Sequence, residues 1–389
     1  MNRTHSMKIY GFILMILLGI VYSYSVIRLN LEDEQGVSAI YSGFPYMFKL
    51  LFFSVSMGFS GYLFRKLGSK KVALIGSIFV VLGFLISYLS KFASNDNLIF
   101  AMTIGYGLFI GLGIGPLYML PLRVLSSNLK KNVGLWTGVT LFGIGISPLF
   151  FSPMITYLFD YYDIFQVFLI LSISYGVLLP FITLNLARMD QTVSTQLVKT
   201  KSALANKNFY IVYALFFIVM FIGLMFIGLS ANLGVHNFLI EKHIMAIFIG
   251  VFSVFNGLGR PLAGTIVDKV SIFKISLFSL LSLLVMILLC FIINDSQILF
   301  LIMMGIVYLN FGAWLSIAPI STRRLFGSEN YSKNYGYMFS AYGISAFIGT
   351  WLSSYIFELI GLNGLYTIAA ILLTVGIGIS LIFRKTLNI

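Results

Sequence analysis

The stretch Gly61-Tyr-Leu-Phe-Arg-Lys-Leu-Gly-Ser-Lys-Lys71 is a short polar segment that separates two long apolar ones. It recurs in outline in the second half of the chain as Gly264-Thr-Ile-Val-Asp-Lys-Val-Ser-Ile-Phe-Lys274. A second pair of matching segments is Lys131-Asn-Val-Gly134 and Lys333-Asn-Tyr-Gly336. The offsets are 203 residues (264 − 61) and 202 residues (333 − 131), so two independent landmarks indicate the same internal duplication.

The amino-acid composition is that of a membrane protein. Of the 389 residues, 59% are hydrophobic and 10% are charged, and the mean hydropathy is +0.99. Soluble domains carry about 25% charged residues, and a helix that crosses a membrane needs about 20 apolar residues. The length therefore accommodates roughly a dozen such helices joined by short loops, with no room for a sizeable soluble domain.

Hydropathy predicts twelve transmembrane helices, six on each side of a polar stretch in the middle of the chain. They are expected at residues 9–28, 39–64, 72–90, 98–123, 133–157, 164–187, 209–232, 244–267, 273–293, 297–322, 334–358 and 364–383. The basic N-terminus and its apolar stretch are similar to a signal peptide but lack a small-residue cleavage site. We therefore expect a retained first helix.

The placement of the charges sets the predicted topology. With both termini on the cytoplasmic side, 20 lysines and arginines fall in inside segments and three in outside segments, whereas nine of the 12 acidic residues fall outside. This is the positive-inside bias of a multi-pass membrane protein. The net charge of +13 resides in short loops rather than on one basic face, so we expect no nucleic-acid partner.

These observations predict an all-α polytopic membrane protein with twelve helices in two pseudo-symmetric six-helix bundles and cytoplasmic termini. The N-terminal bundle is expected over residues 1–187, a cytoplasmic linker over 188–207 and the C-terminal bundle over 208–389. Two parallel repeats with a substrate held between them near the midplane are an architecture of alternating-access carriers. We expect such a protein in the plasma membrane, in contact with lipid and functional as a monomer.

At the first landmark the chain resembles the major facilitator superfamily, whose loop between the second and third helices reads roughly Gly-x-x-x-Asp-Arg-x-Gly-x-Lys/Arg. Gly61, Gly68 and Lys70 match this pattern, but the acidic position is occupied by Arg65. The resemblance implies a gating motif, in which the acid docks on a neighbouring helix end and helps to lock one conformational state. The lock of the first half is therefore in question.

The second copy of this motif keeps Gly264 and an acid, Asp268. The segment before it, Phe255-Asn-Gly-Leu-Gly-Arg-Pro-Leu-Ala-Gly264, resembles the helix 8 signature of the oxalate/formate antiporter family, which is related to monocarboxylate porters. Further similarity lies at Lys333-Asn-Tyr-Gly-Tyr-Met-Phe-Ser-Ala-Tyr-Gly343 and at Tyr22-Ser-Tyr24. The resemblance implies alternating-access transport of a small organic anion such as lactate, formate or oxalate.

Two cations lie inside predicted membrane helices, Lys49 near the centre of one and Arg260 in another, and no acid lies deep in any. Intramembrane charges are costly and mark functional sites. The planar guanidinium also suits a carboxylate. We therefore expect an anion from solution to bind both. The alternatives are that Arg260 extends to the inner membrane surface, and that Lys49 is kept neutral by desolvation or reaches a wet crevice.

The resemblance implies that Arg260 contacts the substrate carboxylate. The family's second cation, a lysine, is replaced here by Tyr342, and we expect Lys49 to take over from across the cleft. Asn256 lies one helical turn before Arg260 and cannot titrate, which favours exchange or facilitated uptake over carboxylate-relayed proton symport. The aromatic residues expected to enclose the substrate are Tyr22, Tyr46, Phe311, Trp314 and Tyr342, with ordinary helix packing as the alternative for each.

An intramembrane enzyme would need buried acids, histidines or cysteines, and the predicted helices offer only Cys290. We therefore expect no enzymatic activity, no cofactor and no metal site. Two alternatives stay open. The chain could be a major facilitator carrier of a neutral solute or drug, or a non-transporting sensor with the same fold.

Overall fold

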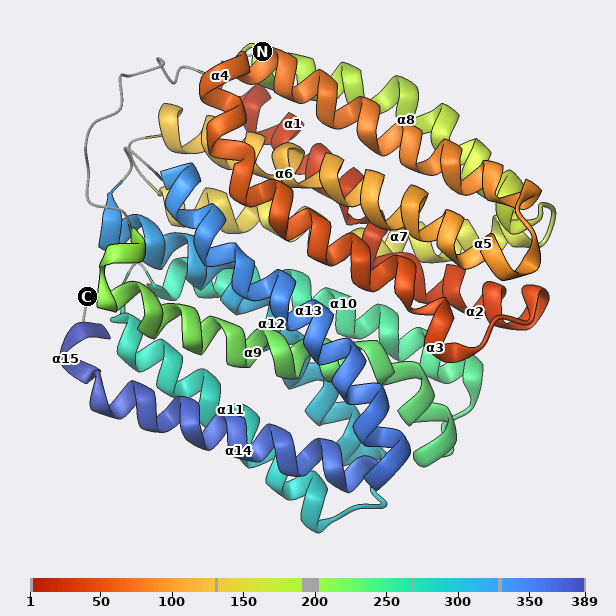
Figure 1. Ribbon diagram of the computed structural model, residues 1–389. Helices are drawn as coiled ribbons and strands as arrows, with labels where there is room; N and C mark the ends of the chain where they lie inside the picture. Colours follow the sequence, from red (N-terminus) through yellow and green to blue (C-terminus); the bar gives the residue numbers. More distant parts are fainter. Residues whose placement is uncertain (1–2, 130–131, 191–202, 268, 328–330, 388–389) are drawn as a thin grey trace.

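The computed structural model describes residues 3–129, 132–190, 203–267, 269–327 and 331–387. Over these ranges the chain is helical and contains no strand, because long apolar segments in lipid must satisfy their backbone groups internally. Figure 1 shows long helices that run side by side through the molecule.

We refer to the elements up to α8 as the first half. They are α1 (Arg3–Leu18), η1 (Gly19–Ser23), α2 (Tyr24–Gln35), α3 (Ala39–Ser42), α4 (Phe44–Leu89), η2 (Ser90–Phe92), α5 (Asn95–Met102), η3 (Thr103–Phe109), α6 (Ile110–Asn128), α7 (Val133–Phe159) and α8 (Ile164–Ala187). Here η1 and η2 are 3₁₀-helices and η3 is a π-helix.

The elements that follow form the second half. They are η4 (Ala203–Ala205), α9 (Lys207–Asn232), η5 (Leu233–Asn237), α10 (Lys242–Val267), α11 (Ile272–Ile292), α12 (Gln297–Phe326), α13 (Tyr331–Ile360), α14 (Leu362–Ile382) and α15 (Arg384–Leu387).

Helix α4 is long enough for two membrane crossings. Its 46 residues would extend about 69 Å at ~1.5 Å per residue, about twice the ~30 Å hydrocarbon core of a bilayer. At Gly68 the backbone leaves the helical region, with φ 75° and ψ 160°. Only glycine adopts this conformation at little cost, which gives Gly68 of the gating motif a structural role as the bend between two predicted spans.

Ten helical stretches in the described residues are long and apolar enough to cross a membrane, and α4 is one of them. Every predicted segment falls on a helix, although α13 is not among these ten. The all-helical membrane fold is therefore confirmed. The count of twelve and the cytoplasmic placement of the termini stay predictions.

Contacts within each half are extensive, and two helix pairs make most of the contacts between the halves. In the first half α4 packs on α6 and α8, and in the second half α12 packs on α9 and α10. Between the halves, α7 lies along α10 and α4 lies along α13. Figure 1 shows the red-to-olive helices grouped beside the green-to-blue ones. The predicted domain limits stay predictions, because much of the segment between the halves lies outside the described residues.

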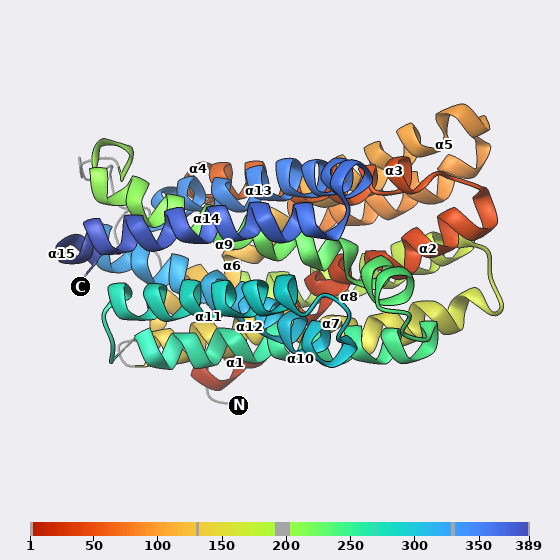
Figure 2. The same ribbon diagram turned by 90° about the horizontal axis from the view of Figure 1, so that it is seen from below.

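Figures 1 and 2 place α15 and the bend of α4 at one end of the molecule, and α2, α3 and α5 at the other. We call these the bend end and the α2 end. Toward the bend end the halves meet closely: a Cβ at Gly336 would lie 2.7 Å from the Cα of Gly58. Nearby, Ser54 Oγ of α4 donates a hydrogen bond of 2.8 Å to the Phe339 carbonyl of α13.

We expect Gly336→Val to force the halves apart at the bend end, because the added side chain would overlap α4. Overpacking costs about 1–3 kcal/mol, so a cysteine placed at Ser54 should react about tenfold faster with maleimide in detergent. The measurement uses Cys290→Ser protein, which lacks the natural cysteine. Gly378→Val is the control, because open space surrounds Gly378. An unchanged rate in Gly336→Val would contradict this close packing.

Candidate functional site

A cavity lies between the halves, on the α2 side of the close contacts. Its volume is about 90 Å³, counted as the space open to the centres of water molecules. Its wall is formed by η1, α2, α4 and α7 of the first half and by α9, α10, α12 and α13 of the second. Polar groups on this wall include those of Tyr22, Tyr46, Ser253, Asn256, Tyr308 and Thr350.

Arg260 is fully buried beside this cavity and bridges the halves. From α10 its Nη1 donates a hydrogen bond of 2.6 Å to the Leu141 carbonyl of α7, and Nη2 donates one of 3.4 Å to Asn256 Oδ1. Its Nε has no hydrogen-bond partner. The two ion pairs found over the described ranges, Arg28 with Glu32 and Arg123 with Asp190, do not include it. The guanidinium therefore faces the protein interior rather than the inner membrane surface.

Lys49 is also fully buried and sits in a cage of tyrosines. Its Nζ donates hydrogen bonds to the Val21 carbonyl at 2.7 Å and to Tyr106 Oη at 3.3 Å. The same nitrogen lies 4.5 Å from the ring centroid of Tyr46, 4.4 Å from that of Tyr106 and 5.3 Å from that of Tyr24. These distances are typical of cation–π contacts, which stabilise an ammonium group most where water is excluded.

Neither cation belongs to the cavity wall itself, but each lies one side chain behind it. Tyr24 and Tyr46, whose rings stack at 5.6 Å, stand between Lys49 and the cavity. Asn256, which accepts a hydrogen bond from Arg260, stands between that arginine and the cavity. The two charges therefore adjoin the cavity from different halves, Lys49 from α4 and Arg260 from α10.

The structure brings four of the predicted site residues to the cavity wall: Asn256, Tyr22, Tyr46 and Phe311. Tyr342 lies behind Tyr22, and the two hydroxyls are 3.1 Å apart across the halves. Trp314 points elsewhere, since its Nε1 donates a hydrogen bond to Ser279 Oγ at 2.9 Å inside the second half. The role of each residue toward a substrate stays a prediction.

Sequence reasoning did not single out three tyrosines of this site, Tyr24, Tyr106 and Tyr308. Tyr106 lies in the π-helical segment η3, between Gly105 and Gly107. Single π-helical turns are frequent at functional sites. Tyr46 stands three residues before Lys49, so helical spacing predicts the contact between them. Tyr24, Tyr106 and Tyr308 come from segments distant in the sequence, so their contacts could not be predicted in this way.

At the α2 end, Arg28 lies in the cavity wall and is neutralised locally. Its Nε donates hydrogen bonds to Glu32 Oε1 at 2.8 Å and to Ser42 Oγ at 3.1 Å. Both charged side chains are 27% exposed. Pairs with this exposure contribute about 0–1 kcal/mol, so they can separate readily when a charged ligand approaches.

The gating motif lies at the bend end. Gly61 is buried in α4, Gly68 forms the bend, Arg65 is half-buried and Lys70 is exposed. In the second copy, Gly264 packs against the Gly134 carbonyl, and Asp268 lies outside the described residues.

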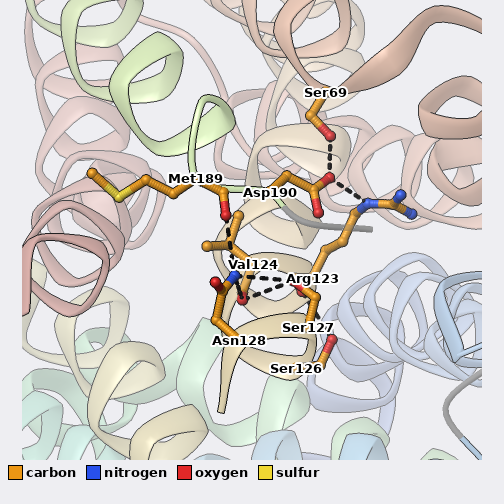
Figure 3. A network of polar contacts seen from close by, with 8 residues as sticks. All are labelled: Ser69, Arg123, Val124, Ser126, Ser127, Asn128, Met189 and Asp190. Atoms are coloured by element: carbon orange, nitrogen blue, oxygen red, sulfur yellow. Dashed lines mark hydrogen bonds and ion pairs between the residues drawn. The ribbon is translucent and has the colours of Figure 1, made fainter. Parts of the chain in front are cut away.

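Beside the first copy, the carboxylate of Asp190 accepts hydrogen bonds from Arg123 and Ser69 (Figure 3). Asp190 follows the last turn of α8, whereas Arg123 belongs to α6 and Ser69 to α4. The acid expected in the motif is therefore absent at position 65, but a different acid contacts the neighbouring helix end.

The outer surface of the helices is apolar, as expected for a membrane protein. Large apolar side chains in the middle of helices are exposed, such as Val177 at 70%, Phe181 at 61% and Phe278 at 76%. Apolar surface on this scale is not left to water, and a bilayer covers it. A bundle of apolar helices in two halves around a central cavity is the architecture of a membrane transporter of the secondary type.

Comparison with known proteins agrees with this class. Residues 9–323 match the model of the Major Facilitator Superfamily, and the chain belongs to this family. It is 22% identical over 378 residues to the oxalate:formate antiporter of Oxalobacter formigenes, covering 95% of this chain and 88% of that protein. It is 24% identical over 358 residues to YhjX, an uncharacterized MFS-type transporter of Escherichia coli strain K12, covering 89% and 86%.

Solved structures share the fold. The proton:xylose symporter XylE, bound to 6-bromo-6-deoxy-D-glucose, aligns with a TM-score of 0.75 at 16% identity over 98% of this chain and 95% of its own. A bacterial homologue of the iron transporter ferroportin, in an outward-facing state, aligns with a TM-score of 0.72 at 11% identity over 99% and 100%. At such identities the similarity establishes the fold alone.

Proposed function

We propose that this protein moves a small organic anion, a mono- or dicarboxylate, across the membrane by alternating access. The main support comes from two fully buried cations, one in each half and each in contact with a residue of the cavity wall. Neither has a carboxylate partner among the described residues. Removing unpaired charges from water costs several kcal/mol each. A bound anion would offset this cost by neutralising the two buried charges.

The positions of the charges suit an anion at the centre of the cavity. At an effective dielectric constant of about 20, a unit positive charge ~8 Å from a unit negative charge attracts it by ~2 kcal/mol. Arg260 would be the main carboxylate anchor, because its guanidinium has an Nε–H without a partner and presents donors in a planar fork. Lys49 would act as the second cation, and Asn256 with the tyrosines of the wall would orient the substrate.

The size of the cavity supports the proposal that the substrate is a small solute. A cavity of about 90 Å³ has room for a solute of the size of formate, lactate or oxalate. The relative whose name is oxalate:formate antiporter supports the same class of substrate.

Exchange or facilitated uptake suits the charges better than carboxylate-relayed proton symport. Over the described ranges, the only acid next to the cavity wall is Glu32, which is paired with Arg28, and Asn256 cannot titrate. An inside-negative membrane potential opposes anion entry by about 2.3 kcal/mol per charge per 100 mV. Exchange for another anion, or consumption of the imported anion, would overcome this opposition.

We further propose that residues 1–187 and 208–389 act as the two moving bundles, with 188–207 as their linker, in a monomer of the plasma membrane. The α7–α10 and α4–α13 contacts support this division, because they are the main contacts that would have to change. The gating residues Gly61, Arg65, Gly68, Lys70, Gly264 and Asp268 would control closure at the bend end.

A neutral polar solute is the second candidate. The wall presents hydroxyl and amide groups, and its one charged member, Arg28, is already paired with Glu32 among the described residues. Structures of similar fold include xylose symporters. A pentose or polyol would use these neutral groups without needing the buried cations.

Counterflow in proteoliposomes tests the proposal directly. The protein is reconstituted with unlabelled solute inside, and uptake of labelled formate, lactate, oxalate or xylose is followed. We expect saturable uptake of at least one carboxylate, which requires the same carboxylate inside and is inhibited by others. Uptake of xylose alone would favour the neutral-solute candidate. Binding without flux would indicate a sensor.

A further inference from the structure

A buried ion pair at the bend end joins the bend of α4 to the ends of α6 and α8 in the first half. Asp190 Oδ2 accepts a hydrogen bond of 2.7 Å from Arg123 Nε and a second from Ser69 Oγ (Figure 3). Only 12% of the Arg123 side chain and 5% of the Asp190 side chain are exposed. Exposed pairs contribute little, but breaking a buried pair by removing one partner is strongly destabilising. The contact is therefore stronger than an ordinary surface ion pair.

Neighbouring groups hold both partners in place. Asn128 Nδ2 donates hydrogen bonds to the carbonyls of Val124, at 2.8 Å, and Met189, at 3.1 Å, and so joins the end of α6 to the residue before Asp190. The Arg123 guanidinium lies over the ring of Phe64 of α4, 5.2 Å from its centroid. The bend of α4 and the ends of α6 and α8 thus converge on one carboxylate.

This carboxylate compensates for the departure of the gating motif. Position 65, where the motif has its acid, is Arg65, which forms no ion pair in the part of the chain that the structure describes. Phe64, the residue directly before it, packs under Arg123. We infer that Asp190 replaces the missing acid of position 65 and is a positioning residue for transport: through Arg123 and Ser69 it holds α4 against α13 and keeps the bend end closed.

Helix α4 carries this effect from the ion pair to the interface between the halves. Between Phe44 and Leu67 it is one uninterrupted helix, so fixing it at Phe64, with Ser69 held just beyond the bend, also fixes the segment that packs on α13. That segment includes Ser54, which donates to the Phe339 carbonyl, and Gly58, which meets Gly336.

The test measures closure without any substrate, so it does not depend on the proposed function. In Cys290→Ser protein, a cysteine at Ser54 reports by its rate of reaction with maleimide in detergent. We expect Asp190→Asn to raise this rate about tenfold, equivalent to ~1.4 kcal/mol of lost preference for the closed state. Adding Arg65→Asp to Asp190→Asn restores a carboxylate at the position where the motif has its acid, next to Phe64, and should return the rate to that of the parent.

Arg65→Asn in the same Asp190→Asn background is the matched control, because it removes the cation without supplying an acid, and it should leave the rate high. Equal recovery with both substitutions at position 65 would overturn the inference, as would an unchanged rate in Asp190→Asn. If Asp190→Asn does not fold, Ser69→Ala removes one hydrogen bond to the same carboxylate and should raise the rate about threefold, since a hydrogen bond contributes about 1 kcal/mol. An unchanged rate in Ser69→Ala would then overturn the inference.

Discussion

Arg260→Gln should abolish carboxylate counterflow, with a loss of about 100-fold or more in kcat/KM. Glutamine keeps an amide near Asn256 but removes the positive charge and the donor fork that would meet a carboxylate. Truncating one partner of a buried, hydrogen-bonded charge pair costs about 2–5 kcal/mol, and each ~1.4 kcal/mol is a factor of ten. Initial rates of labelled carboxylate exchange in proteoliposomes measure the loss.

Two comparisons make this result specific. Arg260→Lys retains the charge but not the planar fork, so we expect intermediate activity. Arg384→Gln removes an exposed arginine at the start of α15, the last helix, and should leave exchange unchanged. Thermal unfolding of each variant shows whether the fold is intact. Exchange that survives Arg260→Gln at a normal rate would remove Arg260 from the site while leaving the transporter family in place.

The fold could be predicted from the sequence, because the features that determine it are either local or repeated in the two halves. Long apolar segments predicted the helices, and the duplication at Gly61 and Gly264 indicated two similar halves. Gly68 stands where a glycine is required, since the backbone there has a positive φ. Arg260 and Lys49 could be predicted to be buried, because a charged residue inside a long apolar segment lies within the membrane-spanning part of the helix.

The detailed site was less predictable, because helix rotation is hidden when a helix is apolar all round. Lipid-facing and core-facing positions both carry apolar residues, so Trp314 and Phe311 look equivalent in the sequence. In the structure Phe311 lies in the cavity wall, whereas Trp314 is bonded to Ser279. Asp190 illustrates the same limit at long range, because its contact with Arg123 joins residues 67 positions apart.

Lys49→Met should weaken carboxylate binding in proportion to the charge of the substrate. Methionine has a similar length and fits the apolar surroundings, so the change removes the charge and its hydrogen bonds to Val21 and Tyr106. At ~2 kcal/mol per unit charge, we expect KM to rise about 30-fold for a monocarboxylate. A dicarboxylate carries two charges in the same field, so its KM should rise far more, up to the square of that factor.

This ratio separates an electrostatic role from a structural one. If Lys49 only fills the cage of Tyr24, Tyr46 and Tyr106, its loss should lower activity by the same factor for both substrates, with a lower thermal unfolding temperature. Lys91→Met is the matched control, since Lys91 also contacts an aromatic ring, that of Tyr88, but at an exposed position. Equal losses for formate and oxalate would leave Arg260 as the single substrate cation and favour a monocarboxylate as the natural cargo.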